Sequence, residues 1–168
     1  MEIFGCYSRN MYRLPTTTKK VVTKKVVIWR IPLKSERLKE CFPNNSNEIA
    51  DRILDYTFCH PYYSQQLAAN VWNIGVLQPE KEDVIGTAID YIVTTHGHDY
   101  ERLWMNFNRT NKWILQRLAK DGMLQTGEHR TSTVYSALKR LQKDGYVIYT
   151  NRYELEDPFF REWIIRGM

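Results

Sequence analysis

The sequence predicts a mainly α-helical protein that ends in a helix, a small two-stranded β-hairpin and a further helix. Apolar residues recur three or four positions apart in several segments from residue 46 onward, which is typical of helices with one buried face. Two short runs of β-branched and aromatic residues, 146–149 and 153–155, are typical of strands. With 43% apolar and 26% charged residues over 168 positions, the chain has the composition of a folded globular protein.

The N-terminal residues 1–45 follow a different pattern. Residues 18–22 and 23–27 are two copies of one pentapeptide, Thr-Lys-Lys-Val-Val, and the second copy continues into Ile28 and Trp29. Paired β-branched residues favour extended backbone, and the lysines would keep an exposed strand edge from pairing with another chain. We therefore predict that residues 1–45 form an extended basic segment and not an independent domain.

A bundle of helices is predicted for residues 46–95. The first helix is capped by Ser46 or Asn47 and ends near Cys59, because Pro61 disfavours helical geometry at the residue before it. Its buried stripe consists of Ile49, Ile53 and Leu54.

Prolines suited to a first helical position mark the next two helices. The second runs from Pro61 to Gly75, and the third starts at Pro79. Acidic residues after Pro79 stabilise the positive end of the helix dipole. The buried stripe of the second helix holds Tyr63, Leu67, Ala68, Val71 and Trp72, and that of the third holds Ile85, Ala88, Ile89 and Ile92.

Residues 94–99 contain two histidines and a glycine, and they predict a linker between the bundle and a last domain at 96–168. Another helical stretch follows, with an apolar side that includes Trp113, Ile114 and Leu118. The dipeptide Asp121-Gly122 is expected to end it.

The last domain closes with a helix, a hairpin and a helix. Thr131 or Ser132 can cap a helix whose apolar positions are Val134, Leu138 and Leu141, and Gly145 is placed as its stop. The strands 146–149 and 153–155 are separated by residues 150–152, a loop of hairpin length. This order of elements is that of a winged-helix domain.

Charge and composition exclude several classes of protein. The net charge of +5 is divided into +7 over residues 1–40, −6 over 41–100 and +4 over 101–168. A basic last third is compatible with a phosphate-bearing partner but does not require one. The chain has neither an apolar run long enough to span a bilayer nor a signal peptide, so we expect a cytoplasmic protein without membrane contact. Cys6, Cys41 and Cys59 are expected to be reduced thiols.

Neither a metal centre nor a catalytic group is predicted. His96, His98 and Asp99 are the one cluster with metal-ligand chemistry, but they lack a fourth ligand and fall in the predicted linker. No arrangement places Cys41 or Cys59 beside a base. We therefore expect no metal, no cofactor and no catalysis in this chain.

Two motifs resemble a known family. The run from Cys59 to Ala68, with Val71 and Trp72 after it, and the run from Asp157 to Trp163 behind the hairpin resemble the C-terminal half of prokaryotic AAA-family ATPases of the archaeal-ATPase, STAND-like type. Near the N-terminus, Phe4-Gly5 and Met11-Tyr12-Arg13 look like the segment that leaves the ATPase core.

The resemblance implies a helical lid at 46–95 and a winged helix at 96–168, preceded in the family by a P-loop domain that binds ATP and Mg²⁺. This chain lacks a Gly-x-x-x-x-Gly-Lys-Ser/Thr motif, so we expect that it does not hydrolyse ATP and is a truncated, split or degenerate product of such a gene. The family's nucleotide-proximal positions correspond to Arg13, His60 and Pro61. Cys59 stands where the family usually has a glycine, which puts a preserved nucleotide pocket in doubt.

The helix before the hairpin is the candidate contact element. If its apolar positions face inward, it presents Thr133, Ser136, Lys139, Arg140 and Lys143 outward, and Arg152 lies at the hairpin tip. These residues could contact DNA or a protein. The short stretch 123–130 leaves little room for the second helix of a helix-turn-helix, which argues against DNA.

Three functions follow from this sequence. The first is a non-catalytic C-terminal part of an ATPase, which couples the lid to a partner surface on the winged helix; its partner is the missing P-loop domain or another protein. The second is a free-standing winged-helix regulator that binds duplex DNA. The third is a protein-interaction module that displays the Tyr- and Trp-rich face of the predicted lid.

Overall fold

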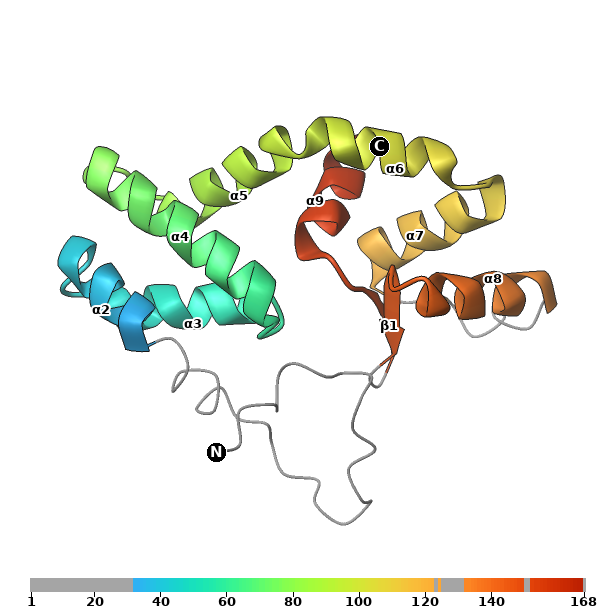
Figure 1. The fold of residues 1–168 in the computed structure, drawn as a ribbon, viewed down its shortest axis with the longest axis horizontal. Coiled ribbons are helices and arrows are strands. Elements are labelled where there is room, and N and C mark those ends of the chain that lie inside the picture. Colours follow the sequence, from blue (N-terminus) through green and yellow to red (C-terminus); the bar gives the residue numbers. More distant parts are fainter. Residues whose placement is uncertain (1–31, 123, 125–131, 150–151, 168) are drawn as a thin grey trace, which may run out of the picture. The chain divides into compact units, whose positions relative to one another are not determined.

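The computed structural model describes residues 32–122, 124, 132–149 and 152–167, and Figure 1 shows its elements. This part of the chain is mainly helical, with one two-stranded antiparallel sheet, as the sequence predicts. It divides into two compact units, an N-terminal unit up to Ile92 and a C-terminal unit from Val93. The boundary lies within helix α5, Val84–Thr95.

The N-terminal unit contains a helix that the sequence did not predict. Helix α2, Pro32–Cys41, packs against helices α3 and α4, so the expectation of extended backbone for residues 1–45 is wrong for this stretch. Leu38 is buried, and the guanidinium of Arg37 lies 5.8 Å from the ring centroid of Trp72 in α4. The repeat at residues 18–27 lies outside the described residues.

The two predicted helices that follow are confirmed. Helix α3 covers Ser46–Tyr56 and helix α4 covers Pro61–Leu77, with Pro61 in the first turn as predicted. Helix α5 begins at Val84, later than the predicted start at Pro79. The cause is Asp83, whose Oδ1 accepts a hydrogen bond from the backbone N–H of Gly86 at 3.0 Å and thereby caps the first turn.

A buried pair of hydroxyl groups joins α3 to α4. Thr57 and Ser64 are both fully buried, and their oxygens lie 2.6 Å apart. Thr57 Oγ1 also donates to the carbonyl of Ile53 at 2.7 Å, so Ser64 is the donor to Thr57. Leu67 in α4 is fully buried, while Tyr63 and Trp72 are half-buried. The apolar face of α4 is thus largely covered by residues of this chain.

The predicted linker at 94–99 is wrong. Helix α5 continues to Thr95, and helix α6, Gly97–Asn106, begins after His96 alone. Helix α6 forms in place of a linker because its aromatic residues are needed in the core. Tyr100 and Trp104 in the helix, and Phe107 directly after it, pack into the core of the C-terminal unit. Helix α7, Arg109–Asp121, follows and ends at Gly122 as predicted, with φ +67° at that glycine.

The final elements match the predicted order. Helix α8 covers Ser132–Lys143, and strands β1, Val147–Tyr149, and β2, Tyr153–Leu155, pair antiparallel with Val147 opposite Leu155. Gly145 ends α8 with φ +84°, a conformation that glycine adopts without strain. Helix α9, Pro158–Gly167, closes the chain.

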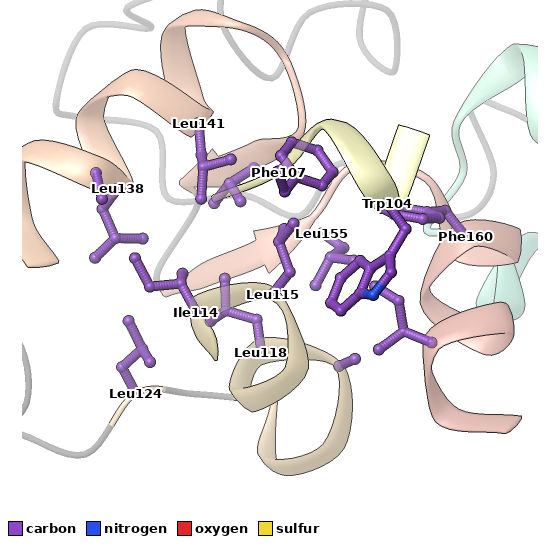
Figure 2. Packing of buried hydrophobic residues seen from close by; sticks show 14 residues of the cluster. Trp104, Phe107, Ile114, Leu115, Leu118, Leu124, Leu138, Leu141, Leu155 and Phe160 are labelled. Atoms are coloured by element: carbon purple, nitrogen blue, oxygen red, sulfur yellow. The ribbon is translucent and has the colours of Figure 1, made fainter. Parts of the chain in front are cut away.

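One hydrophobic core holds the C-terminal unit together. Figure 2 shows side chains of α7, α8, β2 and α9 that point toward one another, with Trp104 and Phe107 beside them. Among the fully or almost fully buried side chains are Ile114, Leu115, Leu118, Leu138, Leu141 and Leu155. The core therefore fixes α8 by its apolar side and leaves the opposite side to solvent.

Asp157 fixes the start of α9. Its Oδ1 accepts hydrogen bonds from the backbone N–H groups of Phe159 at 2.8 Å and Phe160 at 3.0 Å, and Tyr100 donates its hydroxyl to Oδ2 at 3.2 Å. Burial raises the pKa of this carboxyl above its usual value of 3.8, although these three hydrogen bonds act in the opposite direction. The Asp157-Pro158 start of the motif is thus a helix cap.

The raised pKa of Asp157 predicts a pH effect on stability. A group whose pKa is higher in the folded protein contributes most below its unfolded pKa, and the contribution is lost as pH rises through the folded pKa. We expect the wild type to gain stability relative to Asp157→Asn as pH falls from neutral toward 3.8. Urea unfolding of both proteins over that range measures this, and a constant difference would contradict it.

Candidate nucleic-acid interface

The solvent face of helix α8 has an unusual composition. Seven of its twelve residues are exposed, and each of the seven carries either a hydroxyl group or a positive charge: Ser132, Thr133, Tyr135, Ser136, Lys139, Arg140 and Lys143. In α8, which the structure describes throughout, there is no acidic residue. The five contact residues predicted on this helix are therefore all exposed together, on the side opposite the core.

The hydroxyl groups and the charges are separated along the helix. Hydroxyl-bearing residues occupy the first half, and the three cations occupy the second half. Lys139 Nζ lies 5.6 Å from the ring centroid of Tyr135, one turn earlier, and 3.5 Å from Gln142 Oε1. Tyr135 is 53% exposed, so its ring and the ammonium group form one surface.

Two backbone hydrogen bonds close the C-terminal end of α8. The N–H of Tyr146 donates to the carbonyl of Leu141 at 3.0 Å, and the N–H of Gly145 donates to that of Gln142 at 3.3 Å. These two bonds around a left-handed glycine form a Schellman motif, which satisfies the last carbonyl groups of the helix. The chain then turns directly into β1, so helix and hairpin are adjoining parts of one structure (Figure 1).

Arg152, the sixth predicted contact residue, lies directly before β2. Its Nε donates to Glu154 Oε1 at 2.8 Å, and its side chain is 54% exposed whereas that of Glu154 is 17% exposed. Tyr149 on β1 is exposed, with its ring centroid 4.8 Å from that of Tyr153. The hairpin thus adds one cation and one exposed aromatic ring to the unit.

The residues predicted to lie near a nucleotide are not gathered into a site. Arg13 lies outside the described residues. His60 and Pro61 form the start of α4 and are half-buried. A hollow of about 380 Å³ in the same unit is lined by residues of the α2–α3 connection, α3 and the approach to α5, among them Arg52 and Lys81. Neither His60 nor Pro61 lines it.

Cys59 has the backbone conformation that favours glycine. Its φ is +58°, and φ at Phe58 is +51°. The Cys59 N–H donates to the carbonyl of Leu54 at 2.9 Å and the Phe58 N–H to that of Asp55 at 3.3 Å, so α3 ends in a Schellman motif without a glycine. Phe58 is the left-handed residue of this motif. Cys59, where the resemblance implies a glycine, has a positive φ as well, which cysteine adopts at a cost.

This strain gives a prediction. Cys59→Gly removes the clash between the Cβ atom and the backbone, and Cys59→Ala removes only the thiol. We expect the glycine variant to be more stable than the alanine variant by about 1 kcal/mol, even though glycine gains entropy in the unfolded chain. Urea unfolding of the two variants measures the difference. If the alanine variant were the more stable of the two, the strain would be absent.

Metal-ligand chemistry is sparse in the described residues. Within residues 32–122, 124, 132–149 and 152–167, no three His, Cys, Asp or Glu side chains lie close enough to hold a metal ion. His98 Nδ1 lies 3.9 Å from Glu101 Oε2 on the surface of α6, and the ring of His96 packs 6.1 Å from that of Tyr100.

Sequence reasoning missed two features of this surface. Ser132 and Tyr135 extend the exposed face of α8, and the same alternation of buried and exposed positions that identified Ser136 and Lys139 could have found them. Glu154 was also missed. Arg152 falls in the predicted loop directly before the predicted strand, so strand alternation gave no signal for its pairing with Glu154.

The chain was compared with protein-family models, curated proteins and solved structures, and no match was found in any of them. None of the helices in the described part of the chain combines the length and apolar character needed to cross a membrane.

Proposed function

We propose that this chain is a non-catalytic module that binds duplex DNA through helix α8 and the adjoining hairpin. One observation carries the proposal: every exposed residue of α8 bears a hydroxyl group or a positive charge. Most protein–DNA hydrogen bonds go to phosphate and sugar oxygens, and they come from Arg, Lys, Ser, Thr and Tyr side chains. An exposed helix face without a binding role would also contain acidic residues.

The dimensions of α8 suit this role. With 12 residues, α8 is about 18 Å long. An α-helix with its side chains is about 10–12 Å across, which fits the major groove of B-DNA, about 12 Å wide. With the first half of α8 in the groove, Thr133 and Ser136 could reach base edges. Lys139, Arg140 and Lys143 would then meet the phosphate backbone, and Arg152 would add a contact from the hairpin. The core anchors α8 from behind, so little ordering is needed on binding.

Salt dependence tests the proposal. A labelled DNA duplex is titrated with the chain, and fluorescence anisotropy gives the dissociation constant at several salt concentrations. Four phosphate contacts predict a slope of about −3.6 for the logarithm of affinity against the logarithm of salt concentration, or roughly 100-fold weaker binding between about 50 and 200 mM salt. No binding at low salt would refute the proposal.

A second candidate function is the one the resemblance implies. In that reading the chain serves an AAA-type P-loop ATPase as its lid and winged helix, and it does not hydrolyse ATP itself. The positive φ of Cys59, at a position where the family has glycine, favours this candidate. The test is phosphate release by such a P-loop domain with and without the chain. The candidate predicts a changed rate of ATP hydrolysis, and it fails if the rate is unchanged and no complex forms.

A further inference from the structure

Arg152 and Glu154 form an ion pair in which the arginine is exposed and the glutamate is half-buried. The guanidinium uses its Nε–H to bind Glu154 Oε1 at 2.8 Å. The side chain of Glu154 is 17% exposed and that of Arg152 is 54% exposed, so the carboxylate is the fixed partner and the guanidinium projects from it. A guanidinium has five N–H donors, and four of them lie on Nη1 and Nη2.

The guanidinium also lies near the end of α7. Arg152 Nη1 lies 3.9 Å from the place where a Cβ atom on Gly122 would stand. The guanidinium of the hairpin therefore lies next to the glycine that ends α7. It is held from one side by Glu154 and bounded on another by the turn after α7.

We infer that Glu154 is a positioning residue for DNA binding: it holds Arg152 through Nε so that the Nη groups meet a phosphate. The inference deepens the proposed function and rests on it. An arginine that is already ordered loses less side-chain entropy when it binds phosphate, and its planar donors match phosphate oxygens. Glu154 thus promotes the binding of an anion although it is itself negatively charged.

The direction in which Glu154→Ala changes the affinity for DNA distinguishes positioning from simple electrostatics. Electrostatics alone predicts that Glu154→Ala tightens DNA binding, because it removes a negative charge. Positioning predicts the reverse: Glu154→Ala binds about 3-fold to 10-fold more weakly, and its salt slope is smaller by about 0.9, the value of one phosphate contact. Glu154→Gln keeps an oxygen acceptor for Nε–H, and we expect it to bind at least as tightly as the wild type.

Arg152 variants complete the experiment. Arg152→Ala is expected to match Glu154→Ala in affinity and slope, and the double variant to be no weaker than Arg152→Ala alone. Arg152→Lys keeps the charge but lacks Nε–H, so it should also weaken binding, and it tests the inference even if Glu154→Ala is unstable.

Two outcomes would overturn the inference. One is a folded Glu154→Ala that binds more tightly than the wild type, and the other is an Arg152→Lys with unchanged affinity. If the wild type itself does not bind DNA, the proposed function fails; if it binds with a steep salt slope, only the inference is at stake.

Discussion

Reversal of three charges on helix α8 is expected to remove most of the affinity for DNA. The variant Lys139→Glu/Arg140→Glu/Lys143→Glu replaces three exposed cations in the second half of the helix by acids. Each lost phosphate contact removes about 0.9 from the salt slope, and the new carboxylates repel the backbone, so we expect affinity to fall at least about 50-fold at low salt. Anisotropy titration with the same duplex measures the change.

Net charge is controlled by a matched variant. Lys39→Glu/Lys81→Glu/Arg102→Glu changes the net charge by the same amount at three exposed positions outside α8. General electrostatic attraction weakens equally in both variants, so the α8 variant should lose much more affinity than the control if the contact is local. Equal losses in both would mean that the chain binds DNA through its overall charge and not through this helix. Thermal unfolding of both variants confirms that they remain folded.

Truncation of Phe160 is expected to have the largest effect on stability. This ring is 3% exposed and lies among four others, with centroid distances of 5.3 Å to Tyr100, 6.4 Å to Trp104, 6.5 Å to Phe107 and 5.9 Å to Trp163. Phe160→Ala leaves a cavity among these rings and should lower the free energy of unfolding by about 3–5 kcal/mol. Urea unfolding followed by tryptophan fluorescence measures the loss, because Trp104 and Trp163 line the cavity.

A smaller substitution serves as the control for Phe160. Phe160→Leu fills most of the volume and should cost less than half as much as Phe160→Ala. Exposed Tyr149 offers a second comparison, since Tyr149→Ala removes an aromatic ring without a cavity. If Phe160→Ala cost no more than Tyr149→Ala, the rings of α6 and α9 would not form the core described for the C-terminal unit.

Several elements could be predicted because their start, end or conformation depends on residue types within a short stretch of sequence. Pro61 begins α4, Gly122 and Gly145 end α7 and α8 with positive φ, and two short strands pair where β-branched and aromatic residues cluster. These features depend on backbone sterics within a few residues, so the sequence contains them directly.

The elements that were missed depend on tertiary packing or on competing signals. Helix α2 has few apolar residues, and Leu38 is the buried apolar side chain among its residues 37–41, so periodicity could not reveal the helix before α3 and α4 were in place. In α6, His96 and Gly97 gave the signal of a linker, yet the aromatic residues that follow pack into the core and favour a helix. The positive φ of Cys59 could not be predicted from the sequence either, because cysteine rarely adopts a positive φ.

The contact surface could be predicted from the sequence because it consists of the positions of α8 that do not face the core. Once Val134, Leu138 and Leu141 face inward, the helix period places Ser136, Lys139 and Lys143 outward. The ion pair of Arg152 with Glu154 could not be predicted, because Arg152 precedes the strand and strand alternation does not place its side chain.

A salt titration of the wild type beside the α8 charge-reversal variant decides whether α8 presents a surface for duplex DNA. We expect that the wild type binds a DNA duplex at low salt, that its affinity falls steeply as salt rises, and that the variant binds at least about 50-fold more weakly at low salt. Wild-type affinity that is absent at low salt, or equal to that of the variant, would contradict this expectation.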